Sequence, residues 1–384
     1  MKTTSTLLAP LLAAGASATI YYAGVAESGG EFGAYGAPGT GIPGTFGRDY
    51  QFISEAGVDT HVDENHLNLF RIAFLLERMC PPTATTGLGA AFDEAHFAHF
   101  KQAVDYVTVT KGAYAILDPH NYMRYGDPSA QPYSGSVIGG GDSGAATTAQ
   151  FAAFWGELAA RFRDNERVIF GLMNEPHDMA TRLVLDNNQA AIDAIRAAGA
   201  DHLILMPGNS WSGGHAWTEG DDPSSALMNK FSDPANNTAI DIHEYLDVDF
   251  SGSHAECVSD PATHLAALTQ WLKTNKLKAF ITEFGGSNNA GCAAMLRDML
   301  NYMADNEEYI GWTAWAAGPF WGPYSPCCTD SAQLGSLEPG SKAGDGTPGL
   351  YDTVWLPVYQ PLVPTELQWS GKASVEGGEL TVKP

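Results

Sequence analysis

The chain has 384 residues, of which 44% are hydrophobic, so it can bury a substantial core in one large domain or two smaller ones. Acidic residues outnumber basic ones by 44 to 20, and the formal net charge is −24. A field of that sign repels polyanions, which excludes nucleic acid and anionic membranes as partners and favours a neutral substrate.

The N-terminal residues 1–18, MKTTSTLLAPLLAAGASA, are typical of a secretory signal peptide. Lys2 precedes a short apolar stretch, and Ala16-Ser17-Ala18 offers the small residues that a signal peptidase requires. The stretch is too short to cross a bilayer as a helix, and no later segment is long and apolar enough. We therefore expect a secreted protein whose mature chain starts near Thr19.

Short β-rich apolar runs alternate with helical patterns along the rest of the chain. The runs are residues 19–25, 67–74, 114–120, 168–176, 202–209, 239–246, 278–285 and 309–318. Apolar residues recur at helical spacing in 92–111, 151–162, 181–199, 261–275 and 292–306, with Thr181 and Pro261 as start signals. Eight strands, each followed by a helix or a long loop, predict a (β/α)8 barrel.

We expect one domain over residues 19–384 without a carbohydrate-binding module, because no linker rich in proline, serine and threonine and no appended small cysteine-rich unit is visible. A doubly wound open sheet is the main competing fold. It would more often carry a glycine-rich phosphate turn after an early strand, and the glycine-rich residues 29–36 lack that spacing. The longest irregular stretches, 121–147 and 319–349, follow the third and eighth strands and would lie at the C-terminal face of the barrel.

Five cysteines leave at least one thiol unpaired or bonded to another molecule. Cys257 and Cys292 follow the sixth and seventh strands, which are neighbours in a barrel, so we expect these two to form a disulfide. The pairing of Cys80, Cys327 and Cys328 stays open. Asn236 begins a glycosylation sequon, which suits the same secretory compartment.

Polar side chains collect where the predicted strands end. Glu175 follows the fourth strand and Glu283 ends the seventh, so their carboxyl groups should face one another across the barrel mouth. Paired carboxyl groups hydrolyse glycosides, with retention of configuration at a separation of about 5–5.5 Å and with inversion at about 6.5–9.5 Å. Arg71 and Tyr245 could hold Glu283 as a carboxylate nucleophile. Glu175 follows a more apolar run, which would raise its pKa and suit a proton donor.

These residues lie in motifs that resemble those of the family-5 glycoside hydrolases. The motifs are RIAF (71–74), DPHNY (118–122), FGLMNEPH (170–177), DIHEYLD (241–247), ITEFGG (281–286) and GWTAWAAG (311–318). Residues 21–33, YYAGVAESGGEFG, look especially like the secreted fungal endoglucanases of that family, although Ala26 stands where those enzymes commonly have asparagine.

The resemblance, which spans about residues 20–322, implies a retaining endo-β-1,4-glucanase of the cellulase type. By motif, Glu175 would be the acid/base and Glu283 the nucleophile, and Asn174 would bind the sugar 2-hydroxyl. The other residues that it implies at the sugar subsite next to the cut bond are Arg71, His120, His243, Tyr245 and Trp315.

The positions of the other aromatic residues relative to the strands indicate whether they lie in the core or at the site. Trp312 and Trp315 fall in different environments by strand alternation, so we expect Trp312 in the core and Trp315 at the site. Trp211, after the fifth strand, and Trp321, at a leaving-group subsite, are further candidates for sugar contact. Tyr22, Tyr122 and Tyr125 fit packing and cleft lining equally well.

Three alternative functions would use some of the same residues. The same chemistry could act on mannan, xyloglucan or mixed-linkage glucan, because the sequence does not resolve how the sugar 2-hydroxyl is read. A carbohydrate-binding protein without catalysis would not need both carboxylates. His120 and His243 could form a metal pair, but barrel metallohydrolases need an HxH motif after the first strand, where this chain has GVAES (24–28). We therefore expect no metal or other cofactor, a monomer, and β-glucan as the partner.

Overall fold

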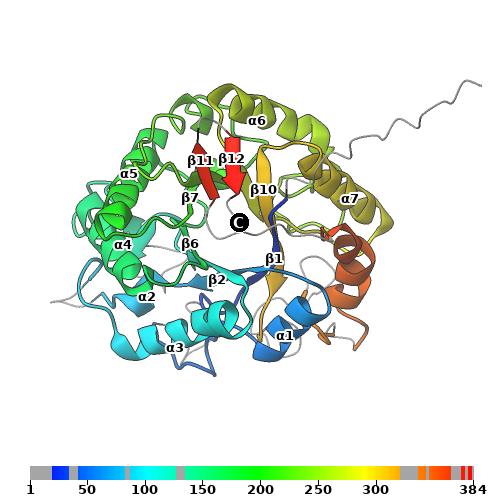
Figure 1. The fold of residues 1–384 in the computed structure, drawn as a ribbon, viewed down its shortest axis with the longest axis horizontal. Helices are drawn as coiled ribbons and strands as arrows, with labels where there is room; N and C mark the ends of the chain where they lie inside the picture. Colours follow the sequence, from blue (N-terminus) through cyan, green and yellow to red (C-terminus); the bar gives the residue numbers. More distant parts are fainter. Residues whose placement is uncertain are drawn as a thin grey trace, which may run out of the picture.

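The predicted barrel is present in the computed structural model, which describes residues 20–33, 42–82, 87–126, 135–320, 336–342, 346–364, 373–376 and 379–382. Within these ranges eight parallel strands close in the order β1-β10-β9-β8-β7-β6-β3-β2, and helices surround them (Figure 1). The barrel strands are β1 Tyr22–Glu27, β2 Leu69–Phe74, β3 Tyr114–Pro119, β6 Val168–Gly171, β7 Ile204–Pro207, β8 Thr238–His243, β9 Ala279–Glu283 and β10 Tyr309–Ala317. The (β/α)8 prediction is confirmed.

The helices are α1 Glu55–Asp63, α2 Leu76–Met79, α3 Glu94–Asp105 with its π-helical continuation η1 Tyr106–Thr110, α4 Thr148–Phe162, α5 Thr181–Ala197, α6 Pro261–Asn275 and α7 Ala290–Ala304. Side chains cap the N-termini of α1, α3, α4, α6 and α7. Thr181 and Pro261 are start residues, as predicted. α4 begins three residues before the predicted range, because Thr147 and Gln150 form a reciprocal capping box.

The connections between these elements depart from a regular alternation. Between β7 and β8 the described chain forms only the short 3₁₀ turns η2 Ser210–Ser212 and η3 Ser224–Ala226. The irregular stretch after β3 contains a small hairpin, β4 Arg124–Gly126 with β5 Gly135–Val137. After β10 come η5 Tyr351–Tyr359 and η6 Gln360–Leu362, and then a second hairpin, β11 Ala373–Glu376 with β12 Glu379–Val382. Val354, Trp355 and Tyr359 are buried in the core, so this part of the C-terminal tail packs on the barrel.

In β2 and β3, the side chains that point into the barrel are apolar in its interior and polar at its C-terminal end. In β3 the inward positions are Tyr114 and Ile116, which belong to the cluster inside the barrel. Asp118 and then His120 continue the same face two and four residues later, and both are buried. In β2, Leu69 lies inside and Arg71 follows it. The apolar cluster inside the barrel therefore packs beneath the polar side chains at the C-terminal ends of these strands.

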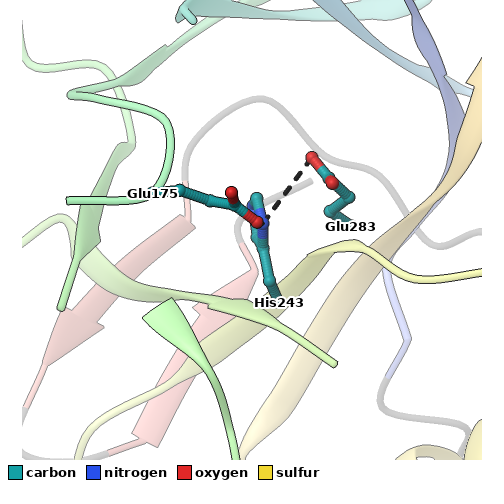
Figure 2. Close-up of side chains that lie close together, drawn as sticks. All are labelled: Glu175, His243 and Glu283. Atoms are coloured by element: carbon teal, nitrogen blue, oxygen red, sulfur yellow. Dashed lines mark hydrogen bonds and ion pairs between the residues drawn. The ribbon is translucent and has the colours of Figure 1, made fainter. Parts of the chain in front are cut away.

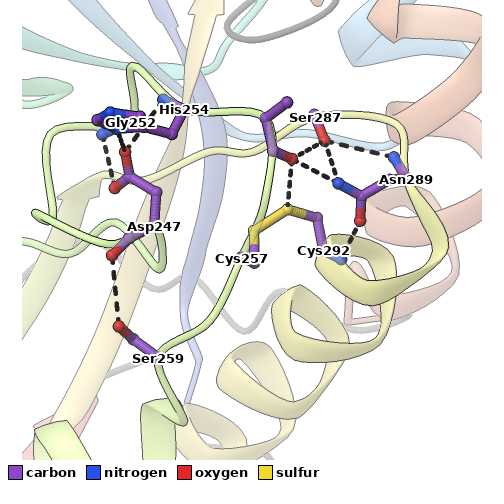
Figure 3. Close-up of a disulfide and its surroundings, with 9 residues drawn as sticks. Asp247, Gly252, His254, Cys257, Ser259, Ser287, Asn289 and Cys292 are labelled. Carbon is purple, nitrogen blue, oxygen red and sulfur yellow. Dashed lines mark hydrogen bonds and ion pairs between the residues drawn. A yellow bond between two sulfur atoms is a disulfide. The ribbon is translucent and has the colours of Figure 1, made fainter.

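The disulfide between Cys257 and Cys292 is present, as predicted from the adjacency of their strands (Figure 3). It joins the loop after β8 to the first turn of α7, where the Asn289 side chain caps the helix through the backbone N–H of Cys292. Asn289 also donates to the carbonyl of Ala255 at 2.5 Å, so hydrogen bonds and the disulfide hold the same loop.

Some of the remaining sequence predictions concern residues that the structure describes, and others concern residues outside those ranges. Among the described residues Cys80 is a buried free thiol, and burial raises its pKa to about 12. The predicted signal peptide, Trp321, Cys327 and Cys328 lie outside the described residues. None of the helices in the described ranges is both long enough and apolar enough to cross a membrane.

Removing the disulfide should destabilise the fold. The bond closes a loop between residues 35 positions apart, so the double variant Cys257→Ala/Cys292→Ala should lose about 3–4 kcal/mol in free energy of unfolding. Denaturant melts of the wild type with and without reductant measure the loss, and reductant should not alter the double variant. Equal stability of wild type and double variant would contradict this prediction.

Candidate active site

The two predicted glutamates meet at the C-terminal end of the barrel (Figure 2). Glu283 ends β9, Glu175 lies four residues beyond β6, and His243 ends β8 between them in the barrel order. One oxygen of each carboxyl group and one nitrogen of His243 all lie within 4.8 Å of one another. The structure therefore brings the two carboxyl groups face to face.

Glu283 accepts a hydrogen bond on each carboxyl oxygen. Arg71 Nη1 donates to its Oε2 at 2.8 Å, and the Tyr245 hydroxyl donates to its Oε1 at 2.9 Å. Burial raises the pKa of Tyr245 well above its ordinary value, so the phenol remains a donor at any physiological pH. Both of these predicted neighbours are in place, and they satisfy Glu283 in its acceptor-only form.

Arg71 is the centre of a buried network that reaches the other predicted residues. Its Nη2 donates to Asn174 Oδ1 at 2.6 Å and lies 3.1 Å from Asp118 Oδ2. Asp118 in turn bonds His120 Nδ1 at 3.0 Å, and Asn174 Nδ2 lies 3.2 Å from His120 Nε2. Every bond is satisfied when His120 carries its proton on Nδ1, because Asn174 can then donate to Nε2. The network fixes the orientation of the Asn174 amide.

Glu175 has a different environment from Glu283. Its side chain is 16% exposed, and its Oε1 lies 2.7 Å from His243 Nδ1. Burial raises the pKa of Glu175 to about 7, although the charge of Arg71, and that of His120 when it is protonated, oppose that shift. Burial also lowers the pKa of His243. Both shifts favour a protonated Glu175 carboxyl group beside a neutral His243 imidazole over the charged pair.

The backbone at Glu175 explains why the apolar strand stops at an amide and an acid. Glu175 has φ = 42°, a left-handed conformation that residues other than glycine adopt rarely. Asn174 N donates to the carbonyl of Pro119, which ties the turn to the end of β3. Strained residues of this kind concentrate at functional sites, where the surrounding structure holds them in place. The turn carries both Asn174 and Glu175 to the mouth of the barrel.

The predicted tryptophans occupy three different settings. Trp315, near the end of β10, stacks on His120 with ring centroids 5.3 Å apart and has the Arg71 guanidinium 5.9 Å from its ring. Trp312 is 1% exposed and belongs to the core, as predicted. Trp211 is 49% exposed and stacks on His177 at 4.5 Å. The structure thus places Trp315 in the site and Trp211 at its edge.

The structure distinguishes the roles of three tyrosines for which the sequence allowed either core packing or cleft lining. Tyr22 lies inside the barrel below the site, and Tyr125 is buried in the main core. Tyr122 packs edge-on against both His120 and His177, so it lies beside the site. Ala26, at which the sequence departs from the resemblance, is buried with Ala316.

Sequence reasoning missed two buried acidic residues on the barrel strands near the site. Asp118 is the partner of both Arg71 and His120, and strand alternation from Ile116 could have identified it. Asp241 is buried in β8, accepts a hydrogen bond from the Thr282 hydroxyl, and has a pKa raised by burial. The pattern Asp241-Ile242-His243 is the corresponding signal.

Two groups in the described part of the chain have the donor atoms of a metal site. The first is Glu175, His243 and Glu283, but the guanidinium of Arg71 lies 2.8 Å from Glu283 and would repel a cation there. The second is Asp247, Asp249 and His254. Asp247 already accepts backbone N–H groups of Gly252 and His254, so it shapes its own loop.

Comparison with known proteins decides the family. The sequence profile described as cellulase (glycosyl hydrolase family 5) matches residues 25–320. The chain belongs to this glycoside hydrolase family. It is 78% identical to Endoglucanase 1 of Robillarda sp. (strain Y-20), with 99% of each chain covered. It is 39% identical to the probable endo-beta-1,4-glucanase B of Aspergillus kawachii, over 78% of this chain and 82% of that one.

Solved structures of similar proteins have the same fold. The chain matches XacCel5A in complex with cellopentaose at 34% identity and a TM-score of 0.72, covering 86% of this chain and 96% of that chain. It also matches Cel5A (EG2) of Hypocrea jecorina at 29% identity and a TM-score of 0.71, covering 87% and 98%. The protein is accordingly an enzyme of the glycoside hydrolase class, built on the barrel typical of its cellulase family.

The unusual pKa of Glu175 can be measured directly. In a ¹³C NMR titration of protein labelled at glutamate side-chain carboxyls, the signal of Glu175 should shift as the pH rises through about 7, since burial disfavours the charged form. The Glu175→Gln variant should lack that signal. A Glu94→Gln variant, altered on the surface of α3, should retain it. Ionisation of Glu175 entirely below pH 5 would contradict the prediction.

Proposed function

We propose that this enzyme is a retaining endo-β-1,4-glucanase that cleaves internal bonds of cellulose-type glucans. The names of its relatives support the substrate. The observation that carries the mechanism is the short gap between the two carboxyl groups, whose nearest oxygens lie within 4.8 Å. Retaining glycosidases hold the two groups about 5–5.5 Å apart, whereas inverting enzymes leave about 6.5–9.5 Å for a water molecule.

In the first step the Glu283 carboxylate attacks the anomeric carbon from the face opposite the leaving group. Glu175 donates its proton to the glycosidic oxygen as that bond breaks. The leaving sugar departs with a new hydroxyl group, and the remaining sugar is bound to Glu283 as an ester. A pKa of about 7 keeps Glu175 protonated for this step at mildly acidic pH.

In the second step Glu175, now a carboxylate, accepts a proton from water. The resulting oxygen attacks the anomeric carbon and releases Glu283. Two inversions at the same carbon give net retention. His243, 2.7 Å from Glu175, provides a hydrogen-bond partner that can follow the change in protonation of that group.

The supporting residues have roles that follow from their contacts. Arg71 and Tyr245 orient Glu283 and stabilise the negative charge that returns to it when the ester breaks. His120 and Arg71 hold the amide of Asn174 in the orientation in which it would meet the sugar 2-hydroxyl. Trp315 offers a ring on which a sugar can stack.

We infer further that the enzyme is secreted and acts as a monomer. The signal peptide predicted at residues 1–18 and the Cys257–Cys292 disulfide suit an oxidising extracellular environment. The sequon residue Asn236 is exposed in a turn after Asp233, so glycosylation there is sterically allowed.

Neutralising either carboxyl group should stop hydrolysis. Glu283→Gln and Glu175→Gln should each lower kcat on cellotetraose by a factor of about 10³ or more, because each removes a group used in bond cleavage. Glu157→Gln, on the exposed face of α4, is the matched control and should keep full activity. Circular dichroism checks folding, and normal activity in either active-site variant would refute its role.

Activity should be internal cleavage of β-1,4-glucan without a metal. Carboxymethyl cellulose should lose viscosity steeply while few reducing ends appear, and EDTA should not slow the reaction, since Arg71 occupies the position of a cation beside Glu283. Mannan, xyloglucan and mixed-linkage glucan are assayed in parallel. Cleavage of mannan alone would overturn the substrate, and silence on every glycan would indicate a binding protein.

A further inference from the structure

Asp247 is a buried acid, two residues after Tyr245, for which the proposed mechanism has no role. It is 2% exposed, whereas its neighbours Val248 and Asp249 are exposed. A buried carboxylate is costly unless hydrogen bonds replace its water, so its contacts indicate what it holds. These contacts lie in the loop between β8 and α6, on the side of the barrel that carries Tyr245 and Glu283.

Both carboxyl oxygens of Asp247 accept hydrogen bonds from the backbone of its own loop (Figure 3). Its Oδ1 accepts from Gly252 N at 3.0 Å, and its Oδ2 accepts from His254 N at 3.1 Å. The Nδ1 of His254 lies 3.0 Å from the same Oδ2, and the Ser259 hydroxyl donates to the Asp247 carbonyl at 3.3 Å. Asp247 therefore fixes the backbone position of Gly252.

Gly252 lies directly against the ring of Tyr245. A Cβ atom at Gly252 would come within 2.5 Å of both Cδ1 and Cε1 of that ring, so only a residue without a side chain fits. Gly252 also has φ = 69°, a left-handed conformation that favours glycine. Gly285, two residues after the nucleophile, approaches the same edge, since its Cβ atom would lie 3.6 Å from Cε1. The loops after β8 and β9 thus pack the Tyr245 ring with their backbones.

The position of the Tyr245 ring decides where its hydroxyl lies, because the phenol oxygen is attached rigidly to the ring. That hydroxyl donates to Glu283 Oε1 at 2.9 Å. A hydrogen bond weakens steeply when its geometry departs from the preferred one, so a shift of the ring would loosen the bond to the nucleophile. A chain of contacts therefore runs from Asp247 through Gly252 and Tyr245 to Glu283.

We propose that Asp247 is a positioning residue for the nucleophile. It holds Gly252 against the Tyr245 ring and so keeps the Tyr245 hydroxyl on Glu283. The inference rests on the proposed function, in which Glu283 attacks the anomeric carbon. Asp247 needs no contact with the substrate, because its whole effect on the reaction passes through Tyr245. This dependence distinguishes it from a residue that only stabilises the loop.

A double-mutant cycle with Tyr245 separates positioning from general damage to the site. Tyr245→Phe should lower kcat on cellotetraose about tenfold, because it removes a hydrogen bond to a charged group. Asp247→Ala should lower kcat about fivefold and leave KM within about twofold, because it loosens the same bond without touching the substrate. In the Tyr245→Phe background, Asp247→Ala should lower kcat by less than about twofold, because no hydroxyl remains to be positioned.

Two further variants test the individual contacts. Asp247→Asn keeps an oxygen that can accept from Gly252 N, so it should retain at least about half of the wild-type kcat. Gly252→Ala keeps both the Asp247 carboxylate and the Tyr245 hydroxyl but brings a methyl group against the ring. It should therefore lower kcat about as far as Asp247→Ala does, and it should likewise add less than about twofold to Tyr245→Phe.

The matched control is Asp260→Ala, at the other end of the same loop. Asp260 also accepts a backbone hydrogen bond, from Thr263 N at 2.9 Å, but it caps α6 and does not contact Tyr245. Its loss should lower the melting temperature and leave kcat within about twofold of wild type.

The outcomes separate this inference from the proposed function. Wild-type kcat in Asp247→Ala or Tyr245→Phe, or independent losses that multiply in the double variant, would overturn the inference. An equal loss of kcat in Asp260→Ala would do the same, because loop stability alone would then explain the effect. In each of these cases an inactive Glu283→Gln variant would leave the two-glutamate mechanism standing. Full activity in Glu283→Gln would overturn both.

Discussion

The active end of this barrel depends on one buried cation, the guanidinium of Arg71. It lies where the apolar interior ends, is 1% exposed, and contacts Glu283, Asn174 and Asp118 at once. A buried charge costs several kcal/mol unless it is paired and fully hydrogen-bonded. The three acceptors therefore have to stay where they are, and with them the nucleophile and the amide that would meet the sugar. Replacing Arg71 would leave Asp118 and Glu283 as adjacent buried acids without a counter-ion.

The same network gives the carboxyl groups of Glu283 and Glu175 different environments. Glu283 lies against Arg71 and Tyr245 and accepts a hydrogen bond on both oxygens. Glu175 lies on a strained turn with burial as the main influence on its pKa, and its hydrogen-bond partner in the described part of the chain is His243. This division of environment is how glycosidases obtain an acid and a nucleophile from the same residue type. The backbone turn at Asn174 and Glu175 is thus part of the chemistry, since it sets how far Glu175 is removed from Arg71.

Much of this arrangement was predictable from the sequence, because strand ends in a barrel converge whatever the loops do. The eight strands, the pairing of Glu175 with Glu283, the neighbours Arg71 and Tyr245, and the Cys257–Cys292 bond all follow from chain order. The role of Asp118 was not predicted, because its contacts depend on which side chain of β2 lies beside β3. The position of Asp247 was missed for another reason. It acts through the backbone of Gly252, and no sequence pattern indicates that this loop turns back onto the ring of Tyr245.

The most direct test of the account is to trap the covalent intermediate. A 2-deoxy-2-fluoro-β-cellobiosyl fluoride forms the glycosyl-enzyme readily but hydrolyses slowly, so intact-protein and peptide mass spectrometry can locate the sugar. The account predicts one 2-deoxy-2-fluorocellobiosyl group per enzyme on the peptide that contains Glu283, and none on the Glu283→Gln variant. Label on Glu175, or turnover that releases product of inverted configuration without any label, would contradict it.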